Sequence, residues 1–264
     1  MDGLTSLEKS LAKTESDADA ALRAATAVVS SLKKFRVAAK TGNLRELRRA
    51  IEVAEEAISA LRQQFSNAKE GWDFNEETYL SGRAFSLEIL EAAEQMGVKI
   101  FEQDDRLYCY PFLIRILPNE RAILIDKKRD RGLRPSIFVN HLRELQNKPV
   151  RFRSEAFLES LCSVYATAVK TRGKDRQGEA AVIPLVEIYG MLTPLPGHSK
   201  EYSRQEFGRD LYLLDQSGVT TTREGKRVSL HTARGNEPDS KVIPIVTRDG
   251  QMKRYYGISF TQER

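Results

Sequence analysis

Apolar residues recur every three or four positions along the first 65 residues of the chain. This spacing predicts an amphipathic helix from Leu4 to about Lys40, with an apolar face made of Leu4, Leu7, Leu11, Ala18, Leu22, Ala25, Val29 and Leu32. Gly42 and Asn43 are typical helix-ending residues. A second helix follows, with an apolar face made of Leu44, Leu47, Ile51, Ala54, Ile58, Leu61 and Phe65. The short break predicts an antiparallel, coiled-coil-like helical hairpin. The pattern leaves open whether residues 4–66 pack on their own domain or form an arm for dimerisation or partner docking.

The pattern changes after a third predicted helix at 76–96, which ends at Gly97. Short runs of β-branched and aromatic residues follow, separated by turn residues at Asp104-Asp105 and at 118–120. These runs predict a small antiparallel sheet with strands at 98–103, 106–110, 112–117 and 121–126. Pro135 is expected to open a helix that runs to about Gln146.

The last part of the chain predicts helices and hairpins in a fixed order. A helix from Ser154 and a short helix at 184–192 precede a Pro- and Gly-rich turn. Ser203 and Glu206 have the spacing of a capping box and mark the start of a helix to Gln216. A hairpin is expected next, with strands at 219–223 and 227–231 that turn at Glu224-Gly225, and a second hairpin joins 242–246 to 254–260 around Asp249-Gly250. Pro244 places its strand at a sheet edge.

This order of elements, from about Val182 to Thr232, resembles the winged-helix (winged helix-turn-helix) superfamily over the last third of the chain. The resemblance implies a module that binds double-stranded DNA. With its apolar residues turned inward, the helix from Ser203 would present Arg204, Gln205, Gly208, Arg209 and Tyr212 to a DNA groove. Arginine pairs with guanine or phosphate, and glutamine reads adenine. The wing would add phosphate or minor-groove contacts from Arg223, Lys226 and Arg227.

Charge is distributed unevenly along the chain. The net charge is +5, but residues 1–126 carry 17 basic and 21 acidic side chains, and residues 127–264 carry 25 and 16. This asymmetry suggests that only the C-terminal half faces a polyanion. The densest basic stretch, 127–154, has a net charge of +7 and predicts a second phosphate contact through Lys127, Lys128, Arg129, Arg131 and Arg134, with Arg143, Lys148, Arg151 and Arg153 nearby. Residues 200–234 carry only seven basic against five acidic side chains, which leaves a protein-binding winged helix as the alternative.

Asp126-x-Lys128 at a strand end, with Asp104 or Asp105 upstream, is similar to the acidic motif of the restriction-endonuclease-like core. That resemblance implies a Mg²⁺-dependent nuclease as a further alternative. A strand that ends in a charged loop explains the same residues, so a non-enzymatic protein is favoured. His141, His198 and His231 are scattered, and no metal site, cofactor site or phosphate-binding loop is predicted. Cys109 and Cys162 are expected to be buried free thiols.

The sequence therefore predicts an α+β chain in three segments. These are a helical arm at 1–72, an α+β domain at 73–149, and a winged-helix domain with an extra C-terminal hairpin at 150–264. No apolar run approaches the roughly 20 residues of a membrane helix, and the N-terminus has no secretory signal pattern, so a cytoplasmic protein is expected. We expect a DNA-binding regulator or subunit of a larger assembly, with residues 4–66 forming a homodimer or binding a partner. The alternative is a scaffold subunit that binds protein through the same elements.

Overall fold

The computed structural model describes residues 6–103, 106–148, 152–172, 181–233, 235 and 238–262. The chain divides into two compact units, each made from separate stretches of sequence. The first unit takes the chain up to Met96, together with Ile116–Ile123 and Asp130–Asn140. The second takes Gly97–Arg115, Leu124–Arg129 and the chain from His141 onward. The sequence predicted three consecutive segments instead.

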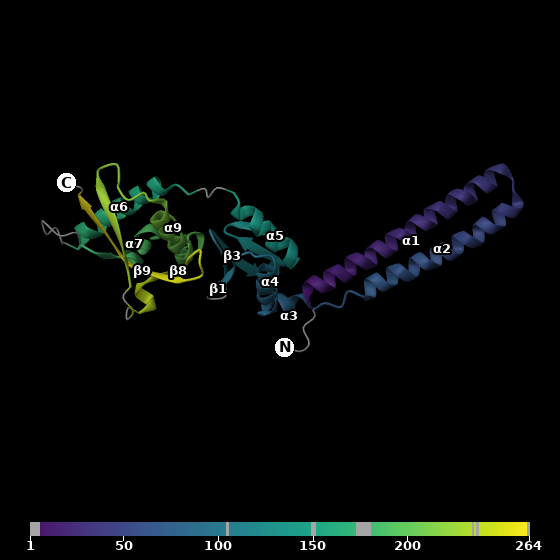
Figure 1. The fold of residues 1–264 in the computed structure, drawn as a ribbon, viewed down its shortest axis with the longest axis horizontal. Coiled ribbons are helices and arrows are strands. Elements are labelled where there is room, and N and C mark those ends of the chain that lie inside the picture. The colour runs from purple at the N-terminus through teal and green to yellow at the C-terminus, as the bar shows by residue number, and fades with distance from the viewer. Residues whose placement is uncertain are drawn as a thin grey trace. The chain divides into compact units, whose positions relative to one another are not determined.

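The helical hairpin is present in the first unit. Helices α1 (Leu7–Thr41) and α2 (Leu44–Glu70) lie side by side as an antiparallel pair (Figure 1). Gly42 ends α1 in the left-handed region at φ 69°, where glycine has no Cβ to clash, and the Asn43 side chain accepts a hydrogen bond from Glu46 N to cap α2. The break is confirmed at the predicted position: Gly42 ends α1 as the sequence indicated, whereas Asn43 begins α2 and does not end α1.

The predicted apolar stripe of α1 is largely exposed within the single chain. The side chains of α1 and α2 that are buried are small or terminal, namely Leu7, Ser31, Ala38 and Ala54. Small residues let the two helix backbones approach closely. Leu22 and Val29 remain 64% and 51% exposed, and on α2 Phe65 is 64% exposed. The periodic pattern thus located the helices but not the side that packs against the neighbouring helix.

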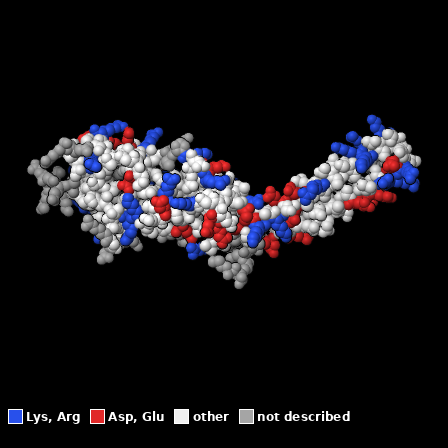
Figure 2. All heavy atoms as spheres, in the orientation of Figure 1, with Lys and Arg blue, Asp and Glu red and all other residues white. Residues whose placement is uncertain are grey.

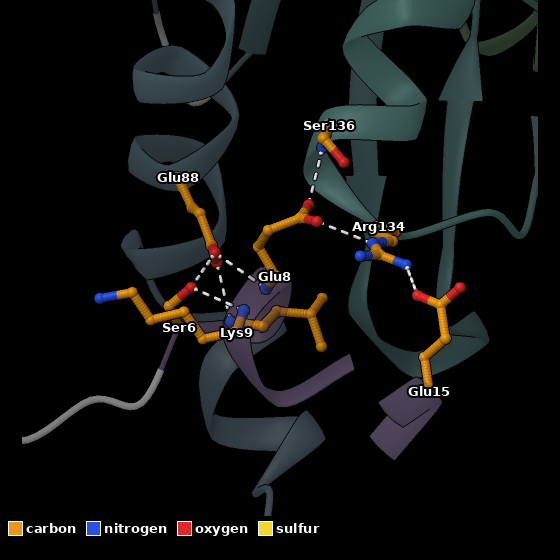
Figure 3. Close-up of polar contacts among 8 residues, drawn as sticks. Ser6, Glu8, Lys9, Glu15, Glu88, Arg134 and Ser136 are labelled. Atoms are coloured by element: carbon orange, nitrogen blue, oxygen red, sulfur yellow. Dashed lines mark hydrogen bonds and ion pairs between the residues drawn. The ribbon is translucent and has the colours of Figure 1, made fainter. Parts of the chain in front are cut away.

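The base of the hairpin is held by carboxylates that cap the start of α1 (Figure 3). Glu88, on α4 (Ala84–Gln95), accepts hydrogen bonds from Leu7 N at 3.0 Å, Glu8 N at 2.9 Å and the Ser6 hydroxyl. These bonds satisfy amides that have no partner inside the helix. The predicted single helix at 76–96 is wrong, because the chain becomes extended at Gly82 and separates α3 (Glu76–Ser81) from α4.

The first sheet has the strand order β1-β2-β3-β4-β5. Its strands are β1 (Phe101–Gln103), β2 (Arg106–Cys109), β3 (Phe112–Leu117), β4 (Ala122–Ile125) and β5 (Lys128–Asp130). The pairs β1/β2 and β2/β3 are antiparallel. A 3-10 turn, Pro118–Glu120, joins β3 to β4, and helix α5 (Pro135–Gln146) begins at the predicted proline. Strand β5 was not predicted, because its sequence Lys-Arg-Asp has no apolar alternation.

The second unit contains the C-terminal elements. They are α6 (Ser154–Thr171), β6 (Ile183–Pro184), α7 (Leu185–Leu192), α8 (His198–Glu201), α9 (Arg204–Ser217), β7 (Lys226–Thr232), a 3-10 turn (Asp239–Lys241), β8 (Ile243–Val246) and β9 (Met252–Gln262). The strand order is β6-β9-β7, with β8 paired to the other end of β9. Tyr255, Phe207 and Leu161 are fully buried in the core of these elements. Helices and antiparallel sheets together make the chain α+β, as the sequence predicted.

The predicted wing hairpin is confirmed at its turn and at the start of its second strand. Thr222 N donates to Lys226 O, Val228 N donates to Thr220 O, and Thr221 bridges Arg227. Residues 219–223 form no regular strand, however, and β7 pairs over its length with β9, as in Val228↔Phe260 and Leu230↔Ile258, a partner that was not predicted. The turn at Glu224-Gly225 and the β8/β9 hairpin are confirmed, and Pro244 lies on an edge strand. Among the described residues, no helix has the length and apolar character needed to cross a membrane.

Candidate nucleic-acid interface

Helix α9 begins where the sequence indicated. Ser203 accepts a hydrogen bond from Glu206 N, and the Glu206 carboxylate accepts one from Ser203 N at 2.7 Å, which completes the capping box. The helix buries Phe207, Leu211 and Leu214, as their spacing predicted, and ends at Gly218. The prediction of this helix and of its inward face is confirmed.

The outward face predicted for α9 is not open to solvent. A Cβ at Gly208 would lie 3.0 Å from Ile243 Cγ2 and 3.0 Å from Pro244 O, so strand β8 packs directly against this side of the helix. Arg204 donates from Nη2 to Ser240 O at 3.0 Å and to Val242 O at 2.6 Å, on the segment that leads into β8. The expectation that Gly208 and Arg204 face a DNA groove is therefore wrong. The strand of the second hairpin occupies that side.

Tyr212 is also buried, with 7% of its surface exposed. Its ring contacts Tyr110 edge-on at 5.5 Å between centroids, and its hydroxyl accepts a long hydrogen bond of 3.4 Å from Arg248 N. Gln205 is half-buried. Tyr212 is thus a packing residue, and its prediction as a DNA contact is corrected.

Arg209 belongs to a partly buried polar network. It donates from Nη1 to Asp126 Oδ1 at 2.8 Å and from Nε to Asp210 Oδ1 at 2.9 Å, while the Tyr202 hydroxyl donates to Asp210 Oδ2 at 2.8 Å. Burial opposes the charge of the guanidinium, but Asp210 and Asp126 outweigh it and raise the pKa of Arg209. The cation predicted to reach DNA is neutralised inside the protein.

Asp126, the acidic residue of the predicted nuclease motif, belongs to the same network. Asp126 sits in the left-handed region at φ 51°, and its Oδ1 accepts hydrogen bonds from Leu113 N at 3.0 Å and from Arg209. Burial raises the pKa of Asp126, and Arg209 opposes this shift. Lys128 is exposed on β5, and the upstream Asp104 and Asp105 lie outside the described residues. A carboxylate already held by Leu113 and Arg209 is poorly placed to bind Mg²⁺.

The predicted wing cations lie around the turn before β7. Arg223 is exposed, while its backbone N donates to Glu159 Oε1 at 2.7 Å. Lys226 forms an ion pair with Glu224 at 2.7 Å, and Arg227 is exposed on β7. Buried Thr222 accepts a hydrogen bond from Lys226 N through its hydroxyl and fixes the turn. The turn therefore presents Arg223 and Arg227 at the surface.

The basic segment after β4 is divided between the two units. Lys127, Lys128 and Arg129 are exposed in the second unit, and Arg131 is exposed in the first. Arg134 donates to Glu8 at 2.7 Å and to Glu15 at 2.5 Å and holds the hairpin base (Figure 3). Its prediction as a DNA contact is corrected, because both carboxylates already neutralise it. Arg143, Lys148 and Arg153 are exposed, and Arg151 lies outside the described residues.

The sequence analysis missed a basic cluster at the end of the hairpin. Residues 33–49, the hairpin tip, carry seven basic side chains against one acidic, a net charge of +6. All seven are exposed: Lys33, Lys34, Arg36, Lys40, Arg45, Arg48 and Arg49. The signal was present in the sequence, but a charge count over residues 1–126 averaged it with acidic stretches elsewhere.

Within the described parts of the chain, no three His, Cys, Asp or Glu side chains come together in a way that suits a metal ion. Both cysteines are buried free thiols, and burial raises the pKa of Cys109 to about 12. His231 lies 2.9 Å from the Ser259 hydroxyl across the β7/β9 pair. What remains at the surface is a set of cations suited to phosphate. No protein-family model, curated protein or solved structure matches this chain.

Proposed function

We propose that this chain is a DNA-contacting subunit of a larger assembly, without enzymatic activity of its own. The observation that supports this most is the arrangement of the C-terminal unit. Apart from the one-turn helix α8 and the inserted edge strand β8, its elements run α6-β6-α7-α9-β7-β9 with the strand order β6-β9-β7, which is the order a winged helix requires. Exposed cations accompany this arrangement at the turn before β7 and after β4.

The proposed contact is with phosphates and not with base edges. Base readout in a winged helix uses the outer face of the helix that corresponds to α9, and here β8 covers that face and Arg209 pairs with carboxylates. Lys127, Lys128, Arg223 and Arg227 are exposed and would contact the backbone. Phosphate contacts carry no sequence information by themselves, so the proposal is binding with little sequence preference.

The test is binding of a labelled random 30-base-pair duplex over a salt series. We expect wild type to bind with an affinity that falls steeply with salt, because each neutralised phosphate adds about 0.9 to the slope of log K against log salt. Replacing Lys127, Lys128, Arg223 and Arg227 together by Gln removes four of these cations and should lower the slope by roughly 2 to 4.

The matched control removes four other exposed cations of the same unit, Lys170, Lys200, Lys241 and Arg248, again as Gln. It should leave the slope within about 1 of the wild-type value. Equal losses in both variants would mean that net charge, and not this surface, governs binding. If the wild-type protein does not bind the duplex at low salt, the proposal is refuted.

A protein scaffold is the second candidate, supported by a specific observation. The covered α9 argues against DNA readout, and the stripe of α1 that includes Leu22 and Val29 is exposed in the single chain. Such a stripe suits a second copy or a partner helix. Both candidates place the protein in the cytoplasm, where Cys109 and Cys162 would remain reduced.

A further inference from the structure

The hairpin tip concentrates positive charge at one end of a helical pair that is otherwise acidic. The parts of α1 and α2 outside the tip, residues 7–32 and 50–70, carry eight acidic against five basic side chains. Figure 2 shows Lys and Arg gathered at the end of the hairpin where α1 passes into α2, and Asp and Glu along its length. A separation of charge within one element directs its positive end toward an anion.

The tip cations have no acidic partner in the part of the chain that the structure describes. The ion pairs of the first unit, such as Arg121 with Glu76 and Arg134 with Glu8, lie elsewhere, and the seven tip side chains form no hydrogen bond or ion pair with the described residues. The single acidic residue, Glu46, uses its backbone N to cap α2 on Asn43. Seven uncompensated charges within 17 positions repel one another and oppose the compact tip unless a counter-anion is present.

The spacing of the cations fits a row of phosphates. On α1, Lys33, Arg36 and Lys40 are separated by three and four residues and therefore share one side of the helix. On α2, Arg45, Arg48 and Arg49 share a side by the same rule. The row on α1 spans seven residues and therefore about 10 Å along the helix axis, which is close to the rise of about three phosphate steps of one DNA strand.

A shallow hollow lies between these two rows. It is lined by Lys33, Lys34, Val37, Ala38, Thr41, Asn43 and Glu46. Its lining combines two ammonium groups with the amide of Asn43 and one carboxylate, that of Glu46, whereas the Thr41 hydroxyl donates to Val37 O and Ala38 O within α1. Amide groups accompany lysine and arginine in phosphate contacts. The tip therefore offers both charge and hydrogen-bond donors.

The tip side chains fit a nucleic acid better than a lipid surface. A helix that lies in a membrane interface has a broad apolar face with Trp, Phe or Leu opposite its basic face. The large exposed apolar side chains of the tip are Val37 and Leu44, and its one aromatic residue, Phe35, is half-buried. Hydrophobic insertion would thus be weak, and the attraction is mainly one of charge.

We propose that the hairpin tip binds the phosphate backbone of duplex DNA, as a contact separate from the one proposed for the second unit. This contact uses only residues of the tip, and it adds a second DNA contact to the proposed function. The hairpin is fixed to the rest of the first unit, because Glu88 and Glu8 form hydrogen bonds that anchor the start of α1 (Figure 3). DNA bound at the tip would therefore lie one hairpin length from the base of α1.

The experiment compares two fourfold variants of the full chain on the same 30-base-pair duplex. The tip variant is Lys33→Gln/Arg36→Gln/Arg45→Gln/Arg48→Gln. The matched control, Lys13→Gln/Arg23→Gln/Arg62→Gln/Lys69→Gln, removes equal charge from exposed positions of the same helices away from the tip. DNA binding of each variant is measured by fluorescence anisotropy over a salt series. The measurement is made in the wild-type background and in a background in which Lys127, Lys128, Arg223 and Arg227 are replaced by Gln.

The tip variant should lose at least about tenfold in affinity at about 100 mM salt and lower the salt slope by roughly 2 to 4 in both backgrounds. The control should change affinity less than about twofold. A second variant, Lys34→Gln/Lys40→Gln/Arg49→Gln, should reproduce the loss with different residues. If the tip variant loses affinity while the variant lacking Lys127, Lys128, Arg223 and Arg227 does not, the tip contact is supported and the contact proposed for the second unit is refuted. If only the latter variant loses affinity, the tip contact is refuted.

Two further outcomes overturn the inference. Equal losses in the tip variant and its control would assign the effect to net charge. Tip-dependent binding to vesicles that contain about 30% phosphatidylserine, with DNA affinity unchanged, would assign the tip to a membrane.

Discussion

At Gly208 two opposing effects of a single methyl group can be compared. Ala favours a helix interior by about 1 kcal/mol relative to Gly. A Cβ here, however, would lie 3.0 Å from Pro244 O, a backbone atom of β8 that has little freedom to move, and equally close to Ile243 Cγ2. Overpacking costs about 1 to 3 kcal/mol. We therefore expect Gly208→Ala to lower the free energy of unfolding, measured by urea denaturation.

Gly190 provides the matched control for this substitution. It also lies inside a helix, α7, but nothing is found within 4 Å of the position its Cβ would take. Gly190→Ala should raise the free energy of unfolding by up to about 1 kcal/mol. A gain in both variants would show that β8 does not press on α9.

Two residues that the sequence marked as candidate functional residues pair with each other in the structure. Arg209 was expected to reach DNA, and Asp126 was the acid of the nuclease alternative. In the structure the two form a partly buried ion pair at 2.8 Å. Removing one partner of such a pair leaves an uncompensated charge in the interior. Loss of DNA binding in an Arg209 variant would therefore need a stability measurement before it was assigned to a lost contact.

At the scale of elements, the start of α1 depends on the ionisation of Glu8. Burial alone would raise the pKa of Glu8, but the hydrogen bond from Ser136 N and the contact with Arg134 outweigh it and lower the pKa below its usual value. A lowered carboxyl pKa adds stability above the unfolded pKa and loses it as the pH falls through the folded pKa. The added stability is thus present at neutral pH and lost below about pH 4.

We expect Glu8→Gln to weaken protection of the first turns of α1 by about 1 to 3 kcal/mol at pH 7, measured by hydrogen exchange of peptides from that region. The difference from wild type should shrink as the pH falls toward about 3. Glu52→Gln, at an exposed position of α2, is the control and should have no such effect. A Glu8→Gln loss that did not change with pH would show that the carboxylate charge is not what anchors α1.

At the scale of the whole molecule, the exposed stripe of α1 predicts self-association. Ala18, Leu22, Ala25 and Val29 share one side of the helix, and a two-fold axis would bring this stripe against its copy in a second chain. We expect wild type to have the mass of a dimer by light scattering, and Leu22→Lys/Val29→Lys to have the mass of one chain. Ile137→Lys/Leu195→Lys changes two exposed apolar side chains elsewhere and should leave the mass unchanged. A single-chain mass for wild type would contradict the prediction.

The sequence by itself determined the elements whose cause is local. Gly42 and Asn43 end and begin helices, Ser203 and Glu206 form a capping box, and Asp249-Gly250 lies between the strands of the β8/β9 hairpin. Each of these rests on backbone conformation or on hydrogen bonds between residues close in the chain, so nearby residue types suffice to predict it. The basic hairpin tip belongs in the same group, because its charges are adjacent in the sequence.

Only the tertiary structure decided which face of each element is covered. The spacing of apolar residues in α9 predicted which of its side chains are buried. The opposite side of the helix is covered by β8, a strand about 30 residues further along the chain. The strand partner of β7 and the fate of Arg134, Arg209 and Asp126 depend in the same way on segments distant in sequence. Periodicity shows that a side chain can be buried or exposed, whereas the covering partner is fixed by the packing of the whole core.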